Sequence, residues 1–388
     1  MLDAAAALKP EADYTLVGQS LPRSDLAAKV SGAAVYVHDM RLPGMQHGGI
    51  VPAQAQTFEM GDRTAVPPYA YADQRITLHD MAPILRASWL RGVSALPNSF
   101  AHESFIDELA TAAAVDPVAY RLRHLPDARA AVLVRATADR AGWLPHTTPQ
   151  RQPPPPVDAQ GDAWLPGQGF AYARYVHSQF PGFGAAWAAW VADVQVNPRT
   201  GQVHVSRVVV GHDAGLMFNP RGVQQQVHGN VLQTTSRAML EQVRIDPLQR
   251  TVASRDWGSY PILQFNQVPV VDVPLMPRPG EPALGVGESA SVPGTAAIAN
   301  AIFDATGVRL RNPPFTPEVV CPTPAAGRWP RPSAPFTPPT SRSTRPPASA
   351  SGRSRPSSGR CGKASRATAT TCTRPSPTPH SARSTMRT

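Results

Sequence analysis

A glutamate in a glycine-rich loop is the carboxylate of this chain whose surroundings best suit chemistry. Glu288 lies in the segment GVGES, residues 285–289. Because glycine has no Cβ, the backbone at Gly285 and Gly287 can approach a flat ligand closely and adopt the positive φ angles of a tight turn. A carboxylate presented in this way suits proton transfer as a general base. We take Glu288 as the candidate catalytic residue, and Gly285, Gly287 and Ser289 as candidate cofactor contacts.

The residues after this loop predict a helix. Apolar side chains recur at helical spacing from Ile298 to Ala305, Pro293 suits a first turn, and Gly307 suits a C-terminal cap. The free N–H groups of the predicted N-terminus favour an anion, which is either the Glu288 carboxylate or a phosphate of a bound cofactor. The alternative is that Glu288 only caps the helix.

Three further helices are predicted from spacing and caps. One spans about 100–113, with Asn98 or Ser99 as its cap, and a short one runs from Asp116-Pro117 to Leu125. A glutamine-rich helix follows Asn219-Pro220 and extends to about Met239.

The strand signals are fewer. A hairpin is predicted from strands 190–196 and 202–210 around a turn at 197–201, and 257–272 is predicted as an edge or irregular strand. Residues 33–37 form a short strand-like run. Together these elements predict an α+β fold, in which Trp187 and Trp190 belong to the core.

The basic charge of the chain is concentrated in its last 67 residues. Of the 37 Lys and Arg side chains, 12 lie in 322–388, which has no acidic residue; 25 basic and 27 acidic side chains remain elsewhere. The segment also lacks Leu, Ile and Val, so we predict a disordered tail over 321–388. Its abrupt composition is what a shifted reading frame in GC-rich DNA produces, and it suits weak polyanion binding.

The sequence places further bounds on function. The three cysteines, Cys321, Cys361 and Cys372, lie at or beyond the edge of the tail, so the folded part is not predicted to bind zinc or iron–sulfur clusters through cysteine. His212 and His102 lack a second His or Cys at ligand spacing, so each is interpreted as structural or solvent-facing. With no signal peptide or membrane span visible, a cytoplasmic location is the default, and a periplasmic one through a partner is the alternative.

Four blocks taken in order carry a family resemblance. They are Leu16–Gly44 with VGQSLPRSD, Trp89–Pro117 with AHESFIDELA, Asp213–Gly229 with QVHG, and Gly285–Gly307 with GVGES. They resemble the molybdopterin-binding large subunit of the xanthine dehydrogenase and aldehyde oxidase family, most closely the isoquinoline 1-oxidoreductase beta-subunit type.

The resemblance implies roles for particular residues. Glu288 matches the general base of oxidative hydroxylation, and Gln226 matches a glutamine at the metal end of the cofactor. Arg91, Gly229 and Gly287 match residues beside that cofactor. The resemblance also implies molybdopterin cytosine dinucleotide as the cofactor and a small subunit with two [2Fe–2S] clusters as the partner. Because this chain lacks clustered cysteines, electrons would have to leave through that partner. The implied substrate is an N-heterocycle or an aldehyde.

The chain also departs from the family pattern. The segment between the first two blocks is too short for a large part of that family's subunit, and His228 and Asn230 replace residues of a Gln-x-Glu-Gly-Gly run. We therefore predict a truncated, internally deleted relative with a partial molybdopterin-binding domain. Its predicted parts are a hammerhead-like fragment (14–57), a junction (58–84), a helical part (85–145), a Pro-rich linker (146–166), the C-terminal part of the domain (167–320) and the tail (321–388).

Three functions stay open at this point. The first is a molybdenum hydroxylase subunit that passes electrons to an iron–sulfur partner. The second is a catalytically inactive remnant of such a subunit, because a lost core segment leaves apolar faces uncovered. The third is weak polyanion binding through the tail.

Overall fold

The computed structural model describes part of the 388-residue chain, all of it within the first of two units, residues 1–337. The described residues are 10–36, 61, 63–74, 76, 89–149, 163–178, 183–246, 248–249 and 251–321. The predicted tail beyond 321, residues 37–57 of the predicted hammerhead fragment, residues 58–60, 62, 75 and 77–84 of the predicted junction, and residues 150–162 of the predicted linker lie outside them.

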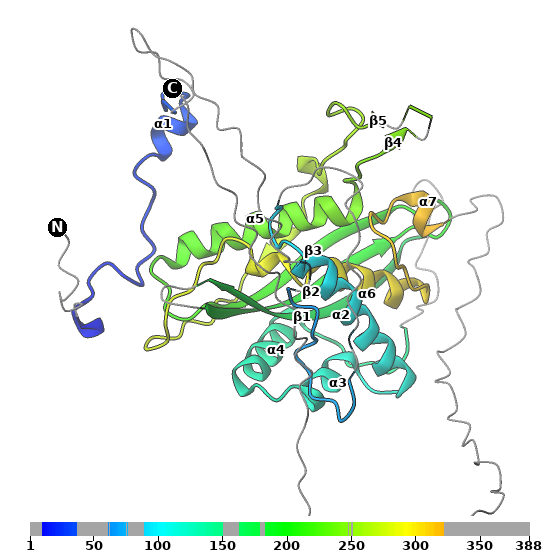
Figure 1. The fold of residues 1–388 in the computed structure, drawn as a ribbon, viewed down its shortest axis with the longest axis horizontal. Coiled ribbons are helices and arrows are strands. Elements are labelled where there is room, and N and C mark those ends of the chain that lie inside the picture. The colour runs from blue at the N-terminus through cyan, green and yellow to red at the C-terminus, as the bar shows by residue number, and fades with distance from the viewer. Residues whose placement is uncertain are drawn as a thin grey trace, which may run out of the picture. The chain divides into compact units, whose positions relative to one another are not determined.

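A four-stranded sheet in the order β1-β2-β3-β6 forms the centre of the described part (Figure 1). The strands are β1 (Leu165–Ser178), β2 (Phe183–Val196), β3 (Val203–Asp213) and β6 (Val270–Asp272). The first three pair antiparallel, and β6 joins the edge of β3 in parallel. This sheet confirms the predicted hairpin, whose turn is closed by the Asn197 side chain as it accepts hydrogen bonds from the N–H groups of Arg199 and Thr200.

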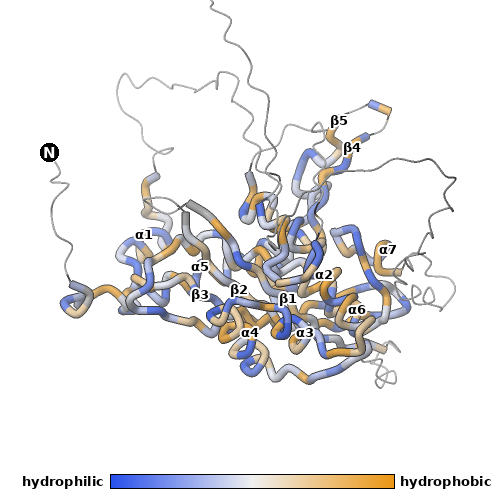
Figure 2. The backbone as a smooth tube through the Cα atoms, turned by 60° about the horizontal axis from the view of Figure 1, so that its bottom comes forward, coloured by the Kyte–Doolittle hydropathy of each residue, from blue (hydrophilic) through white to orange (hydrophobic). Residues whose placement is uncertain are grey.

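Helices cover both faces of this sheet. Ala171, Trp190 and Val208 of the strands pack in one cluster with residues of α5 and α6, whereas Tyr172 and Val191 pack in a second cluster with α2, α3 and α4. The α-helices are α1 (Leu26–Val30), α2 (Ala95–Ala112), α3 (Pro117–His124), α4 (Ala128–Ala141), α5 (Pro220–Met239), α6 (Gly294–Thr306) and α7 (Pro317–Val320). Apolar stretches, orange in Figure 2, lie on α4 and α6 beside the sheet.

Smaller elements complete the described part. A separate two-stranded hairpin joins β4 (Ile245–Asp246) to β5 (Thr251–Val252). Three 3-10 helices are η1 (Glu11–Asp13), η3 (Phe265–Gln267) and η4 (Ser289–Ser291). Among the helices described, none is long and apolar enough to cross a bilayer.

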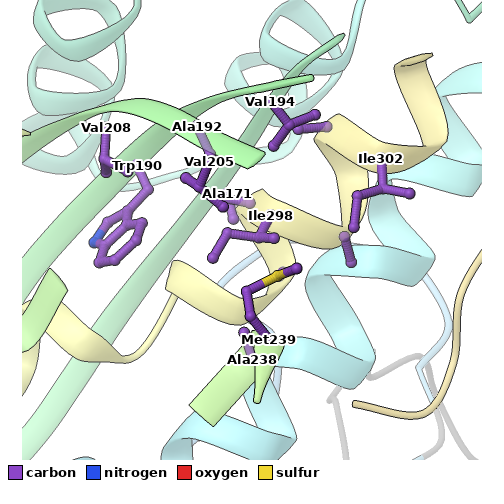
Figure 3. Packing of buried hydrophobic residues seen from close by; sticks show 14 of the residues in the cluster. Ala171, Trp190, Ala192, Val194, Val205, Val208, Ala238, Met239, Ile298 and Ile302 are labelled. Carbon is purple, nitrogen blue, oxygen red and sulfur yellow. The ribbon is translucent and has the colours of Figure 1, made fainter. Parts of the chain in front are cut away.

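Helix α6 lies unusually close to strand β1. A Cβ added to Gly169 would come within 2.1 Å of the Ala301 nitrogen, and one added to Gly167 within 2.2 Å of the Ala301 oxygen. Any residue with a Cβ would clash with the helix at these two positions, so only glycine lets the helix and the strand pack this closely. On the same side of the sheet Ile298 and Ile302 pack toward the strands, together with Met239 of α5 (Figure 3). The segment Gly167-Gln168-Gly169, at the start of β1, therefore serves helix–strand packing.

The sequence prediction was right for most helices and incomplete for the strands. The short helix capped by Asp116 and the glutamine-rich helix after Asn219 are α3 and α5, and Gly307 ends α6 at φ 71° as predicted. For α2 the helix was predicted correctly but the cap was not, because the helix begins after Ser94. Strand β1 and helix α4 were not predicted.

One predicted extended segment is confirmed only at its end, where it forms the edge strand β6, and the other is wrong. Only Val270–Asp272 of the segment 257–272 is a strand, and part of the rest is the 3-10 helix η3. Residues 33–36, which were predicted as strand-like, have no regular structure, and Val37 is outside the described residues.

Residues 63–74 form no regular element, yet they pack on the helices. The Tyr69 hydroxyl donates to Glu103 at 2.7 Å, the Ala70 N–H donates to the His124 carbonyl at 2.8 Å, and Tyr71 stacks on the His124 ring. A segment predicted as a featureless junction thus includes a stretch that is anchored to α2 and α3.

Candidate active site

The Glu288 carboxylate is held by two donors from distant parts of the chain. Glu288 is the N-cap residue of η4, but its side chain makes no capping hydrogen bond. Instead the Gly92 N–H donates to Oε2 at 2.9 Å and the Tyr175 hydroxyl donates to Oε1 at 2.6 Å. The side chain is half-buried. The alternative that Glu288 caps its own helix is therefore wrong, since the carboxylate is turned toward other elements.

Tyr175 connects this carboxylate to a cation. It is buried in strand β1, and its hydroxyl oxygen accepts a hydrogen bond from Arg63 Nη1 at 2.6 Å. The Arg63 guanidinium also lies 5.5 Å from the centre of the Tyr175 ring. Burial, and then the hydrogen bond to Glu288, raise the pKa of Tyr175 to about 12. The phenol is consequently protonated at neutral pH and acts as a donor to Glu288.

The second donor comes from a strained turn just before α2. Gly92 has φ +94° and Val93 has φ +47°, in a region where a β-branched residue is rarely found. A Cβ at position 92 would also lie 2.9 Å from the Ser291 hydroxyl and 3.2 Å from Leu96. Glycine at 92 thus provides both the left-handed turn and the close approach to η4. The turn aims a free N–H at the carboxylate.

Arg91, next to this turn, reaches helix α5. Its Nη2 lies 3.5 Å from the Gln226 Oε1, which is a long hydrogen bond. A Cβ added at Gly229 would lie only 2.9 Å from the Arg91 Nη1. The Arg91 carbonyl accepts from Arg237 at 2.7 Å. The predicted residues Glu288, Gln226, Gly229 and Arg91 therefore meet at the 91–92 turn. Gly229 makes room for the arginine.

Strand β3 fixes the loop that leads to Glu288. The backbone of Arg278 and Leu284 donates to the carbonyls of Gly215 and Ala214, at 3.2 and 3.1 Å. Asp213 accepts from Arg278 and from Arg129. Gly215, at φ +74°, lies so close to this loop that a Cβ would be 2.1 Å from the Pro282 oxygen. The residues at the end of β3, Asp213 to Gly215, thus position the loop that precedes Glu288.

The glycines that flank Glu288 differ from the expectation in conformation. Neither Gly285 nor Gly287 has a positive φ, so the turn does not require glycine for that reason. Both are exposed, and open space surrounds the position of a Cβ at Gly287. Their contacts with a cofactor remain a prediction that this open surface allows.

Ser289 does not lie on that surface. It is 1% exposed, and its hydroxyl is 2.8 Å from Nε2 of the buried His212. The Ser289 side chain is therefore not available to a cofactor on that surface. The pair instead joins η4 to strand β3, which makes His212 structural, as predicted.

His102 and Glu103 also belong to the structural interior. Glu103 is fully buried and accepts from Arg121 Nε at 2.9 Å, from Tyr69 and from the Tyr172 N–H. Among the described residues, no group of three or more His, Cys, Asp or Glu side chains is arranged to hold a metal ion.

Three residues of the site were not predicted from the sequence. Gly92 follows Arg91 in the second block, so its position beside a predicted residue was a usable signal. No sequence signal points to Tyr175 or Arg63, because they lie 113 and 225 positions from Glu288 in segments without a motif. Only the folded chain brings them to the carboxylate.

Comparison with known proteins agrees with the resemblance. A family model described as a molybdopterin cofactor-binding domain matches residues 129–269. A nicotinate dehydrogenase subunit of Pseudomonas putida is 63% identical over 273 residues, which cover 70% of this chain and 22% of that protein. The beta subunit of isoquinoline 1-oxidoreductase from Brevundimonas diminuta is 28% identical over 308 residues, which cover 76% of this chain and 36% of that protein.

Among solved structures, the aldehyde oxidoreductase of Desulfovibrio gigas aligns with a TM-score of 0.46 at 15% identity, over 60% of this chain and 41% of that one. The assignment therefore depends on the sequence matches. Over the part that they cover, the chain is similar to molybdopterin-binding subunits of the xanthine dehydrogenase and aldehyde oxidase family. It spans about a fifth of the length of its Pseudomonas putida relative.

Proposed function

We propose that this chain is a molybdenum hydroxylase subunit that hydroxylates an N-heterocycle, with Glu288 as the general base. The observation that carries the proposal is the convergence of Glu288 and Gln226 on the turn at Arg91 and Gly92. The high identity to a relative named as part of a nicotinate dehydrogenase favours an N-heterocycle over an aldehyde. The proposal includes molybdopterin cytosine dinucleotide as the cofactor and a small [2Fe–2S] subunit as the electron acceptor.

The residues present fit an anionic, pterin-type cofactor on this side of the fold. Arg91 supplies a guanidinium, Gln226 is exposed beside it, and the backbone at Gly287 is open to close approach. The Oδ1 atom of Asn230, which is fully buried one helical turn after Gln226, has no hydrogen-bond partner in the described part of the chain. Such an acceptor suits a polar donor brought by a ligand.

Each residue then has a stated task. When bound, the cofactor supplies the two-electron oxidation. The Glu288 carboxylate accepts a proton, and its orientation is set by Gly92 and Tyr175, which occupy one acceptor position on each oxygen. Arg91 and Gln226 hold the polar end of the cofactor by charge and hydrogen bonding.

The test uses the full chain co-expressed with a [2Fe–2S] small subunit. We expect molybdenum close to one per chain, and substrate-dependent reduction of an electron-accepting dye with nicotinate as the first probe and a benzaldehyde as the second. Chain that is purified without molybdenum would contradict the proposal and favour the catalytically inactive alternative. Turnover of the aldehyde alone would overturn the substrate class.

The role of Glu288 is tested by Glu288→Gln. General-base catalysis contributes roughly 100- to 10,000-fold, so kcat should fall by that order while molybdenum content is kept. Glu281→Gln is the matched control, because Glu281 lies on the same loop but is an exposed partner of Arg129. Equal kcat for Glu288→Gln and wild type would exclude Glu288 as the base.

A further inference from the structure

A hydrogen-bonded chain of three side chains ends on the proposed base. Arg63 donates to the Tyr175 oxygen at 2.6 Å, and the Tyr175 hydroxyl donates to Glu288 Oε1 at 2.6 Å. The three residues come from the 63–74 segment, from strand β1 and from the loop before η4. None of the sequence blocks that define the family likeness includes Arg63 or Tyr175.

We propose that Tyr175, held by Arg63, is a positioning residue that fixes the orientation of the Glu288 carboxylate. The inference rests on the proposed function, in which Glu288 is the base. The rigid part of the device is strand β1, since Tyr175 is paired in register with Ala186 of β2 and its side chain is fully buried. The Arg63 backbone is in turn held by Asn98 of α2, whose Nδ2 lies 3.0 Å from the Arg63 carbonyl.

The geometry explains why two donors are needed. A Glu side chain has three rotatable bonds, and one hydrogen bond to one oxygen leaves the carboxylate plane free to turn. The Gly92 N–H fixes Oε2, and the Tyr175 hydroxyl fixes Oε1, so that both oxygens are placed. Arg63 directs the Tyr175 proton toward the carboxylate, because the phenol oxygen accepts from the cation and therefore donates to the anion.

The first test needs no cofactor. The full chain is labelled with 3-fluorotyrosine at Tyr175 alone, and its fluorine NMR spectrum is compared with those of the Glu288→Gln and Arg63→Met variants. We expect both substitutions to shift the Tyr175 resonance. The same label at Tyr172, a buried residue of the same strand, should not shift. Arg174→Met, which removes a cation on β1, is the matched control for Arg63→Met.

The second test uses the co-expressed, metal-loaded complex. Tyr175→Phe removes the donor and keeps the ring, so we expect kcat to fall roughly tenfold with KM changed less than twofold. Arg63→Met should reduce kcat by a smaller factor. A structural role alone predicts lost protein or metal and an unchanged kcat per molybdenum.

The outcomes separate the two proposals. An unshifted Tyr175 resonance in Glu288→Gln would overturn the positioning role, whatever the turnover. So would an unchanged kcat in Tyr175→Phe when Glu288→Gln is inactive. If the fluorine resonance shifts and Glu288→Gln keeps full turnover, the contact is real but the assignment of the base is wrong.

Discussion

At the scale of single residues, the site depends on a glycine whose importance is conformational. Gly92 adopts φ +94°, where L-residues are strained, and it faces Ser291 and Leu96 closely. We expect Gly92→Ala to lower the free energy of unfolding by about 2–3 kcal/mol, as strain and crowding add. Gly142→Ala is the control, because Gly142 has φ +72° but no atom within 4 Å of a Cβ. Urea unfolding should show a clearly smaller loss of unfolding free energy for Gly142→Ala than for Gly92→Ala. Equal losses would show that crowding by Ser291 and Leu96 does not contribute.

A second residue-scale prediction concerns the buried Glu103. Burial raises the pKa of its carboxyl, but the charge of Arg121 and hydrogen bonds from neighbours lower it more, so the net pKa falls below the ordinary 4.5. A lowered pKa in the folded state means that ionised Glu103 stabilises the fold above pH 4.5, and that this stabilisation is lost as the pH falls toward 2.

Removing that carboxylate leaves Arg121 buried without its main partner. Glu103→Gln should therefore lower the free energy of unfolding at pH 7 by about 3–5 kcal/mol and flatten its decline in acid. Denaturant titrations at pH 7 and pH 3 measure both effects. Glu108→Gln on the same helix is the control, because its partner Arg311 is 60% exposed and the loss should be about 1 kcal/mol or less. A flat pH profile in wild type would contradict the prediction.

At the scale of elements, strand β1, which carries Tyr175, packs closely against helix α6, which follows Glu288 in the chain. Alanine at Gly169 would place a Cβ 2.1 Å from the backbone of α6, which cannot move without opening the core. Gly169→Ala should cost at least about 3 kcal/mol, and near-ultraviolet circular dichroism should report loosened packing around Trp190. Gly258→Ala, with only an ordinary contact at 3.4 Å, should be neutral. A stable Gly169→Ala variant would mean that the helix does not lie against the strand.

The same contact shows which elements a sequence can predict. Helices α3 and α5 carry local signals, since Asp116 and Asn219 cap the next turn at 2.8 and 3.0 Å. Strand β1 has no such signal. Its residues 170–173 are all buried, so the alternation typical of a half-exposed strand is absent, and its glycines are explained only by a helix about 130 positions later.

The residues of the candidate site also divide into those with a sequence signal and those that only the fold reveals. Glu288 and its loop were found from local pattern, and Arg91, Gln226 and Gly229 from the family likeness. Tyr175 and Arg63 required the fold. The Ser289 side chain turns into the core although its neighbour Glu288 is only half-buried, which local pattern does not reveal.

At the scale of the whole molecule, charge is divided unevenly along the chain. Residues 322–388 hold 12 of the 37 basic side chains and no acidic one, and the rest has a slight excess of acid. We expect the full chain to bind heparin or DNA weakly at low salt, and the chain shortened to residue 321 not to bind. Retention on heparin across a salt gradient measures this. Equal retention of the two forms would place polyanion binding elsewhere.

The hydrogen bond from Gly92 to Glu288 joins residues 196 positions apart. Its amide proton therefore exchanges with solvent at a rate that reports whether two remote segments are docked, because either one can separate while every helix stays intact. Deuterium uptake at this one amide distinguishes an assembled site from a chain that has kept its secondary structure and lost its centre.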